Sequence, residues 1–176
     1  MKRFRVQFRA NGSAVASIAV ALATLATAIA PKPAFAQAAY GSYIGVGPSF
    51  GISTGDGRQI GGVVAVRYKL LELPLSLRAQ ALIGHATAVV PTISYDIPLN
   101  WQTDVYVGVG ATFAGSDEGK PSPIGDKTSF AVQPGIDYVL PNSNAVLFGN
   151  AIIAFDAYRN SGGPAFSLQG GVGMKF

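Results

Sequence analysis

Phe166-Ser-Leu-Gln-Gly-Gly-Val-Gly-Met-Lys-Phe176 alternates large apolar side chains with small or polar ones. Successive side chains of a β-strand point to opposite sides, so Phe166, Leu168, Val172, Met174 and Phe176 fall on one face of an extended chain. The other face carries Ser, Gln, Gly and Lys. The segment therefore predicts a β-strand with one apolar face and one small, polar face.

Seven other segments repeat the same period of two. In each, large aliphatic and aromatic residues occupy one face, and Gly, Ala, polar or charged residues occupy the other. Eight such strands joined by turns predict an all-β, eight-stranded, antiparallel up-and-down transmembrane β-barrel. A proline removes a ladder donor and a closed barrel has no edge to hide it, so we expect bulges at Pro48, Pro91 and Pro134. The seven segments span residues 44–51, 59–70, 75–83, 89–97, 104–113, 129–138 and 147–156.

The alternative fold is a soluble secreted β-protein of the lipocalin or sandwich type, whose apolar face points into a core. Such a protein needs a charged exterior. Here the charged residues of the strands all lie on the face that also carries Gly and Ala. An outward face of Val, Ile, Leu, Phe and Tyr would cause aggregation in water and suits lipid. The membrane barrel is therefore the favoured fold.

The N-terminal residues 1–36 have the pattern of a cleaved signal peptide. A basic segment precedes an apolar run over 14–30, and two small residues stand two sites apart just before Gln37. An uncleaved membrane anchor is the alternative, but the run is at the short end for a spanning helix. We expect export and cleavage before Gln37. The bases are Lys2, Arg3, Arg5 and Arg9, and the residues of the cleavage site are Ala34 and Ala36.

The basic balance of the whole chain comes from this N-terminal segment. There are 13 Lys and Arg against 9 Asp and Glu, but five of the bases precede residue 37 and every acid follows it. A nucleic-acid partner is therefore not expected. The absence of cysteine excludes disulfides and thiolate metal sites, and we expect no cofactor. Residues 37–176 are enough for one domain, the barrel.

The connections alternate in kind. Those at 71–74, 98–101 and 141–144 are tight and contain proline, as expected at the periplasmic end of such a barrel, whereas 51–58, 84–86, 115–126 and 159–164 are predicted to face outward. Aromatic residues gather at both ends of the strands, where interfacial rings are stable. The predicted periplasmic girdle is Tyr68, Tyr95, Tyr138 and Trp101, and the predicted outer girdle is Phe50, Phe113, Phe130, Phe155 and Phe166.

The signal peptide, the eight segments and the terminal Gly-Val-Gly-Met-Lys-Phe176 together resemble the small outer-membrane barrels of the outer membrane protein A and opacity-type surface protein group. The resemblance covers 40–176 and implies a bacterial outer-membrane location, lipid as the surrounding partner, and assembly by periplasmic chaperones and the barrel assembly machinery. We expect the barrel to be a monomer. In that group the machinery reads a terminal aromatic and the alternate apolar residues before it, here Phe176, Met174, Val172 and Leu168; Gly170 departs from that pattern.

Few residues suggest chemistry. His85-Ala86-Thr87 is similar to the His-x-Ser of outer-membrane lipid A deacylases, but Thr87 replaces the Ser and no acidic partner can be assigned. A polar loop residue at the headgroup level is the preferred interpretation of His85, and no enzymatic activity is expected. Acids in the 115–126 loop are interleaved with Lys and lack calcium-loop spacing, so no metal site is expected.

The small-residue face predicts a lumen that contains charges of both signs. Hairpin folding sets like charges side by side, and the lumen of an eight-stranded barrel is narrow enough for opposite walls to meet in an ion-pair network. We expect Arg78 to be the most shared cation, and Gly45, Gly47, Gly171 and Gly173 to leave space for a thread of water. The function is then a structural or surface-interaction barrel with a mostly plugged lumen, or alternatively a narrow pore. The predicted network is Arg67, Lys69, Arg78 and Lys175 with Asp96, Asp104, Asp137 and Asp156.

Overall fold

The computed structural model describes residues 41–52, 58–117, 120–159 and 162–176, and eight long strands make up most of this part of the chain. The predicted signal peptide lies outside the described residues. Within the same part, no helix is long and apolar enough to cross a membrane. The long strands are β1 (Tyr43–Ile52), β2 (Arg58–Lys69), β3 (Leu75–Ile83), β4 (Thr87–Pro98), β5 (Thr103–Ala114), β8 (Ser129–Val139), β9 (Ala145–Phe155) and β10 (Ala165–Lys175).

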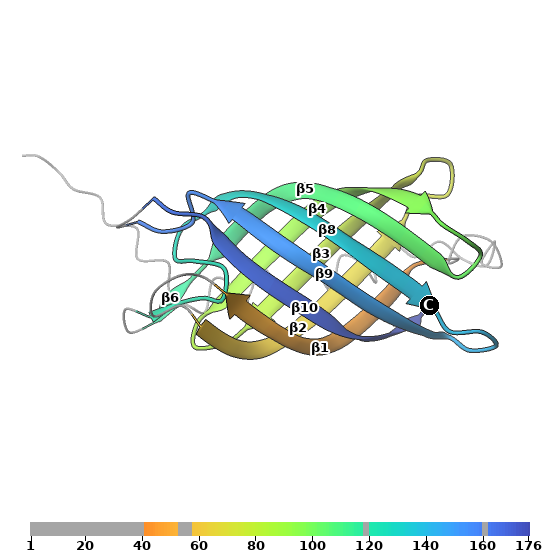
Figure 1. Ribbon diagram of the computed structural model, residues 1–176, viewed down its shortest axis with the longest axis horizontal. Coiled ribbons are helices and arrows are strands. Elements are labelled where there is room, and N and C mark those ends of the chain that lie inside the picture. Colours follow the sequence, from red (N-terminus) through yellow and green to blue (C-terminus); the bar gives the residue numbers. More distant parts are fainter. Residues whose placement is uncertain (1–40, 53–57, 118–119, 160–161) are drawn as a thin grey trace, which may run out of the picture.

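The eight long strands form a closed antiparallel barrel. Each pairs with its neighbour in the chain, and β1 pairs with β10 to close the ring (Figure 1). The short strands β6 (Ser116–Asp117) and β7 (Lys120–Pro121) form a separate two-stranded sheet between β5 and β8. The predicted fold class is therefore confirmed.

The tight turns and the long connections occupy opposite ends of the barrel (Figure 1). The turns after β2, β4 and β8 lie at what we call the turn end, beside Phe176, whereas the end of β1 and the described parts of the connections after β3, β5 and β9 lie at the loop end. Backbone bonds close the turns, among them Leu70 N to Leu75 O at 2.9 Å and Leu140 N to Ala145 O at 3.0 Å. A residue's position along its strand therefore gives its height in the lumen.

The three strand prolines interrupt the ladder without a bulge. β1 pairs with β10 in one register on both sides of Pro48, with Val46 opposite Val172 and Ser49 opposite Gln169. A bulge inserts an extra residue and would shift that register. The same continuity holds between β4 and β5 around Pro91 and between β8 and β9 around Pro134, so the predicted bulges are wrong. Each proline turns its missing donor toward one neighbour and keeps its pairing with the other.

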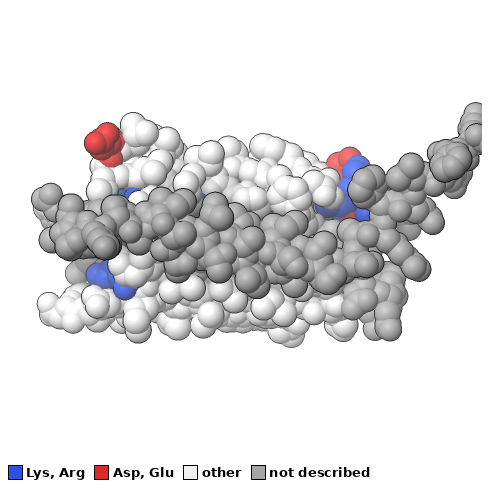
Figure 2. All heavy atoms as spheres, turned by 180° about the vertical axis from the view of Figure 1, so that it is seen from behind, with Lys and Arg blue, Asp and Glu red and all other residues white. Residues whose placement is uncertain are grey.

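The two faces of the barrel wall differ as the alternation predicts. Large apolar side chains on the outer face are exposed along whole strands, for example Val107 and Val109 in β5, while the alternate residues Tyr106 and Gly108 are buried. In the view of Figure 2, the visible Lys, Arg, Asp and Glu gather toward the two ends, and most of the described surface between them carries no charge. Such a surface suits an apolar solvent.

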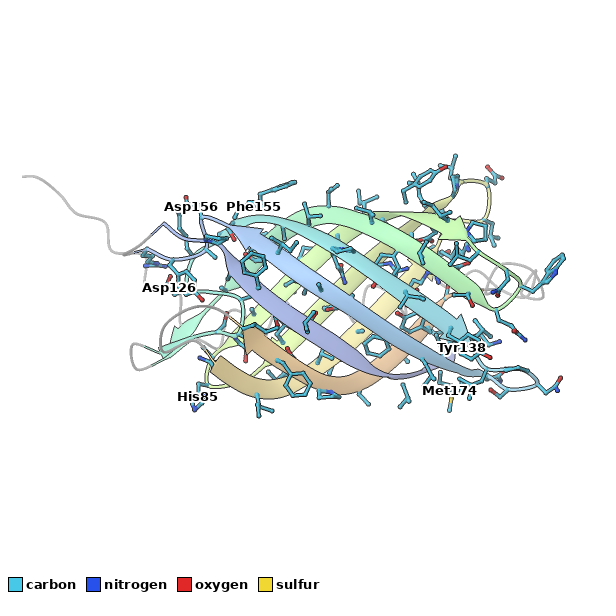
Figure 3. All side chains as sticks on the ribbon, viewed as in Figure 1. His85, Asp126, Tyr138, Phe155, Asp156 and Met174 are labelled. Carbon is cyan, nitrogen blue, oxygen red and sulfur yellow. The ribbon has the colours of Figure 1, made fainter. Side chains whose placement is uncertain are left out.

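The aromatic residues of both predicted girdles lie on the outer surface. Trp101 is 94% exposed in the turn between β4 and β5, and the rings of Phe130 and Phe155 stack at a centroid distance of 6.1 Å near the loop end. Tyr138 lies toward the turn end and Phe155 toward the loop end (Figure 3). The other members are likewise exposed: Tyr68, Tyr95, Phe50, Phe113 and Phe166.

Candidate functional site

The turn-end half of the lumen holds a buried cluster of charges centred on Arg67. Its guanidinium donates from Nη2 to Asp96 at 2.7 Å and to Asp104 at 2.8 Å, and from Nη1 to Asp137 at 2.9 Å. The Arg67, Asp96 and Asp137 side chains are 2%, 1% and 1% exposed. The acids come from β4, β5 and β8, so one cation of β2 reaches across the lumen and ties the opposite wall to its own.

Arg78 on β3 lies beside Arg67 and shares two of its partners. Its Nη2 is 2.8 Å from Asp137 Oδ2 and 3.3 Å from Asp96 Oδ1. The guanidinium carbon lies 3.3 Å from the centroid of the Tyr106 ring, in cation–π geometry. Among the described residues, Arg67 has ion pairs with three carboxylates and Arg78 with two, so the most shared cation is Arg67 and not Arg78.

Hydroxyl groups complete the coordination of these charges. Tyr43 donates to Asp137 Oδ1 at 2.9 Å, and Ser94 donates to Asp96 Oδ1 at 2.9 Å while accepting from Arg78 Nε. Ser76 accepts from Arg67 Nε at 3.1 Å and donates to Asp96. Buried charges are tolerated when each is paired and hydrogen-bonded, as these are. Ser76 and Ser94 lie two residues before Arg78 and Asp96, so the alternation places them on the same inward face as these charges. This pattern could have identified both serines from the sequence.

Of the predicted network, the structure brings Arg67, Lys69, Arg78, Asp96, Asp104 and Asp137 together. Lys69 is at the rim, 3.1 Å from Asp104 and 24% exposed. Lys175 is half-buried at the same end of the barrel, opposite Tyr43 in the β1–β10 register.

Asp156 does not belong to the lumen cluster. It directly follows β9 with a φ of 55°, and its carboxylate pairs with Lys127 at the loop end (Figure 3). The left-handed backbone ends the alternation of β9, so the parity that points earlier residues inward no longer applies. The prediction that Asp156 joins the network is therefore wrong.

Aromatic rings fill the space that glycine leaves along the seam of β1 and β10. A Cβ on Gly45 or on Gly171 would lie 2.7 Å from the Phe148 ring, and one on Gly173 would lie 2.9 Å from Tyr43 Cδ2. The Tyr43 and Phe148 rings stack at 5.8 Å. A Cβ on Gly47 would meet the backbone of β10, 2.0 Å from Gly170 O. The predicted water thread is therefore wrong, because these glycines make room for rings and for close strand contact.

The loop-end half of the lumen contains large apolar side chains, which the sequence pattern did not predict, beside buried polar ones such as Ser49, Thr112 and Ser167. Val63, Leu82, Val90 and Ile152 are at most 2% exposed and belong to one buried cluster with Ile124 from the β7–β8 connection. The alternation places these four strand residues on the inward face. Because they are apolar, however, the sequence alone does not distinguish them from the outward-facing apolar residues. Polar side chains lie between the two halves, including the Thr92 Oγ1 to Gln133 Oε1 bond of 2.6 Å.

A small cavity opens at the turn end and ends on the charge cluster. Its volume is about 160 Å³, and its lining includes Lys69, Asp104, Trp101, Arg67 and Asp137. Because the last two are the buried centre of the network, the ion pairs form the floor of the cavity. The arrangement can fix strands and obstruct passage.

His85 is exposed in the short connection between β3 and β4, at the loop end (Figure 3). The described residues contain no group of three or more His, Asp or Glu side chains suited to a metal ion. The loop acids considered for calcium fall partly outside the described residues.

No protein-family model matches this sequence. No match was found among curated proteins either. Among solved structures, the chain is similar to a de novo designed transmembrane β-barrel, with a TM-score of 0.53 and 12% sequence identity. The match covers 77% of this chain and 96% of the designed one. At this identity the likeness shows the fold alone, a barrel of the transmembrane type.

Proposed function

We propose that this chain is an integral outer-membrane barrel with a structural or surface-interaction role and a closed lumen. The observation that carries the proposal is the distribution of side chains between the two faces. Exposed apolar residues surround the barrel, while Arg67, Arg78, Asp96 and Asp137 are at most 5% exposed inside it. In water the reverse distribution is the stable one, whereas lipid favours this one.

The closed lumen supports a role that does not depend on flow. Ion pairs fill the turn-end half of the interior, and buried apolar and small polar side chains fill the loop-end half, so the described side chains pack the lumen along its length. The narrow-pore alternative gains no support from this packing. We expect planar-bilayer recordings of the purified protein to show at most brief, small openings, and a steady large conductance would favour the pore instead.

The location is proposed from the N-terminal pattern and the resemblance to outer-membrane barrels. Export would remove residues 1–36, periplasmic chaperones and the barrel assembly machinery would insert the rest as a monomer, and Phe176 would act as the terminal signal. The test is membrane fractionation of expressing cells combined with gel mobility of heated and unheated samples. We expect the protein in the outer-membrane fraction, beginning at Gln37 by mass and migrating faster when unheated. Soluble periplasmic protein without a mobility shift would refute the proposal.

Lipid A modification is the enzymatic alternative, and no observation favours it. His85 would be its only histidine. We expect the His85→Asn variant to leave the lipid A mass spectrum of the host unchanged relative to cells that express the original protein. A lipid A species that depends on His85 would instead establish an enzyme.

A further inference from the structure

Residues of the connection between β7 and β8 pack against the inner wall at the loop end of the barrel. Residues 122–125 are buried although they belong to a connection, and the Ile124 side chain is 0% exposed. Ile124 belongs to the same buried cluster as Leu82 and Ile152 on the inner wall. A loop apex buried in this way is placed to obstruct that end of the lumen.

We propose that residues 122–127, the loop plug, form an apolar gate that seals the loop end of the lumen independently of the ion-pair cluster at the turn end. The proposal rests on the membrane-barrel function above and adds a movable element to it. Apolar constrictions in membrane proteins obstruct water and ions by dewetting, without charges. The two seals lie in series, one apolar and one ionic.

The loop plug is shaped by its own turn and seated on two other connections. Ser122 N donates to Gly125 O at 2.9 Å, Gly125 N donates to Ser122 O at 3.1 Å, and Ser122 Oγ also donates to Gly125 O. On one side Pro123 packs against Gly84, where an added Cβ would lie 3.1 Å from the proline Cγ. On the other side Gly125, with φ +108°, is so close to Ala157 that a Cβ would lie 2.3 Å from the Ala157 carbonyl oxygen.

Hydrogen bonds and one exposed ion pair tie Asp126 and Lys127 of the loop plug to Ala157, Arg159 and Asp156. Asp126 N and Lys127 N both donate to Ala157 O, at 3.0 and 3.2 Å, and Arg159 N donates to Asp126 Oδ1 at 3.0 Å. The Lys127–Asp156 pair is 41% and 61% exposed. Solvent-exposed pairs contribute little, and segments tied in this way open at a lower cost than a hydrogen-bonded core. The loop plug is therefore expected to move while the barrel wall stays closed.

The absence of cysteine permits a direct test. Ile152→Cys places one thiol on the inner wall beneath the loop plug, and its labelling by a charged, membrane-impermeant thiol reagent reports access from the loop end. Gly125→Ala introduces a Cβ into the Ala157 contact at a left-handed position and dislodges the plug. We expect it to raise the labelling rate about ten-fold or more, because such backbone strain shifts a local opening equilibrium by that order.

The controls separate plug opening from general loosening. Thr128→Ala, an exposed change in the same connection, is expected to leave Ile152→Cys labelling unchanged, and Thr128→Cys should label equally fast with and without Gly125→Ala. Ile124→Ala serves as a second opening variant if Gly125→Ala does not fold. If the labelling rate of Ile152→Cys is the same with and without the substitution in the loop plug, whatever that rate is, the proposal is overturned. The difference in gel mobility between heated and unheated samples shows for each variant whether the barrel has folded. If the unaltered protein lacks this difference, the result counts against the proposed membrane barrel and not only against the gate.

Discussion

Replacing Arg67 by Met tests whether the buried charge cluster stabilises the barrel. Arg67 is the cation that three carboxylates share, and two of these, Asp96 and Asp137, are 1% exposed. With Arg67 removed, Arg78 and Lys69 would face three acids. Removing one partner of a buried pair costs about 3 to 5 kcal/mol, since the remaining charge stays buried without compensation. We take about 4 kcal/mol for Arg67→Met, whose side chain keeps most of the volume.

The assay is urea unfolding of protein refolded into lipid vesicles, followed by the fluorescence of Trp101, the only tryptophan. With a slope of about 2 kcal/mol per M, a loss of about 4 kcal/mol lowers the urea midpoint by about 2 M. Lys69→Met is the matched control, because Lys69 has one ion pair at the rim and should cost at most about 1 kcal/mol. Adding Asp137→Asn to Arg67→Met rebalances the charge and should recover about 1 to 2 kcal/mol. An Arg67→Met midpoint within about 0.5 M of the original protein would refute the reasoning.

Three further predictions concern packing, assembly and the outer face. Gly135→Ala places a Cβ 2.4 Å from the Tyr106 ring and should lower the free energy of unfolding by about 1 to 3 kcal/mol in the same urea assay. Gly149→Ala is the control, because its nearest neighbours are 3.9 Å away, and it should change the free energy of unfolding little. Equal effects of the two substitutions would contradict the packing argument. Deleting Phe176 should reduce the outer-membrane yield in cells more than it reduces the stability of protein refolded in vitro, and unchanged yields would mean that the terminal signal is misassigned. Val109→Arg, in the middle of an outward strand face, should destabilise the vesicle-embedded barrel by about 2 to 4 kcal/mol, while a change near zero would argue against lipid contact there.

The fold was predictable because alternation is a global property of this chain. Most positions of each of the eight strands follow the period of two, although Val63, Leu82, Val90 and Ile152 are apolar and inward, and a single parity error would turn an entire strand over. The structure has the predicted strands in the predicted order. The prolines were harder. Their missing donors were foreseen, but sequence does not reveal that the register continues unchanged around Pro48, Pro91 and Pro134.

The charge cluster was predictable to the extent that parity determines which side chains share the lumen. Alternation does not show how far a side chain extends across the lumen or which residues meet at the same level. The sequence therefore predicted Arg78 as the most shared cation, whereas the structure gives Arg67 that position. Alternation also fails where the backbone leaves the strand conformation, as at Asp156. The glycine space was misinterpreted for a related reason, since only packing shows that the rings of Tyr43 and Phe148 occupy it.

The like-charged neighbours in the wall bear on how the barrel forms. Arg67 stands directly opposite Arg78 on the adjacent strand, and Asp104 stands directly opposite Asp137. Like charges placed opposite each other destabilise a strand pair, so each of these pairings is unfavourable in a flat, half-assembled sheet. Only curling the sheet until its walls face each other brings the arginines to the aspartates. The electrostatic gain therefore arrives at ring closure, and an open or strand-exchanged sheet would keep the repulsion without that gain.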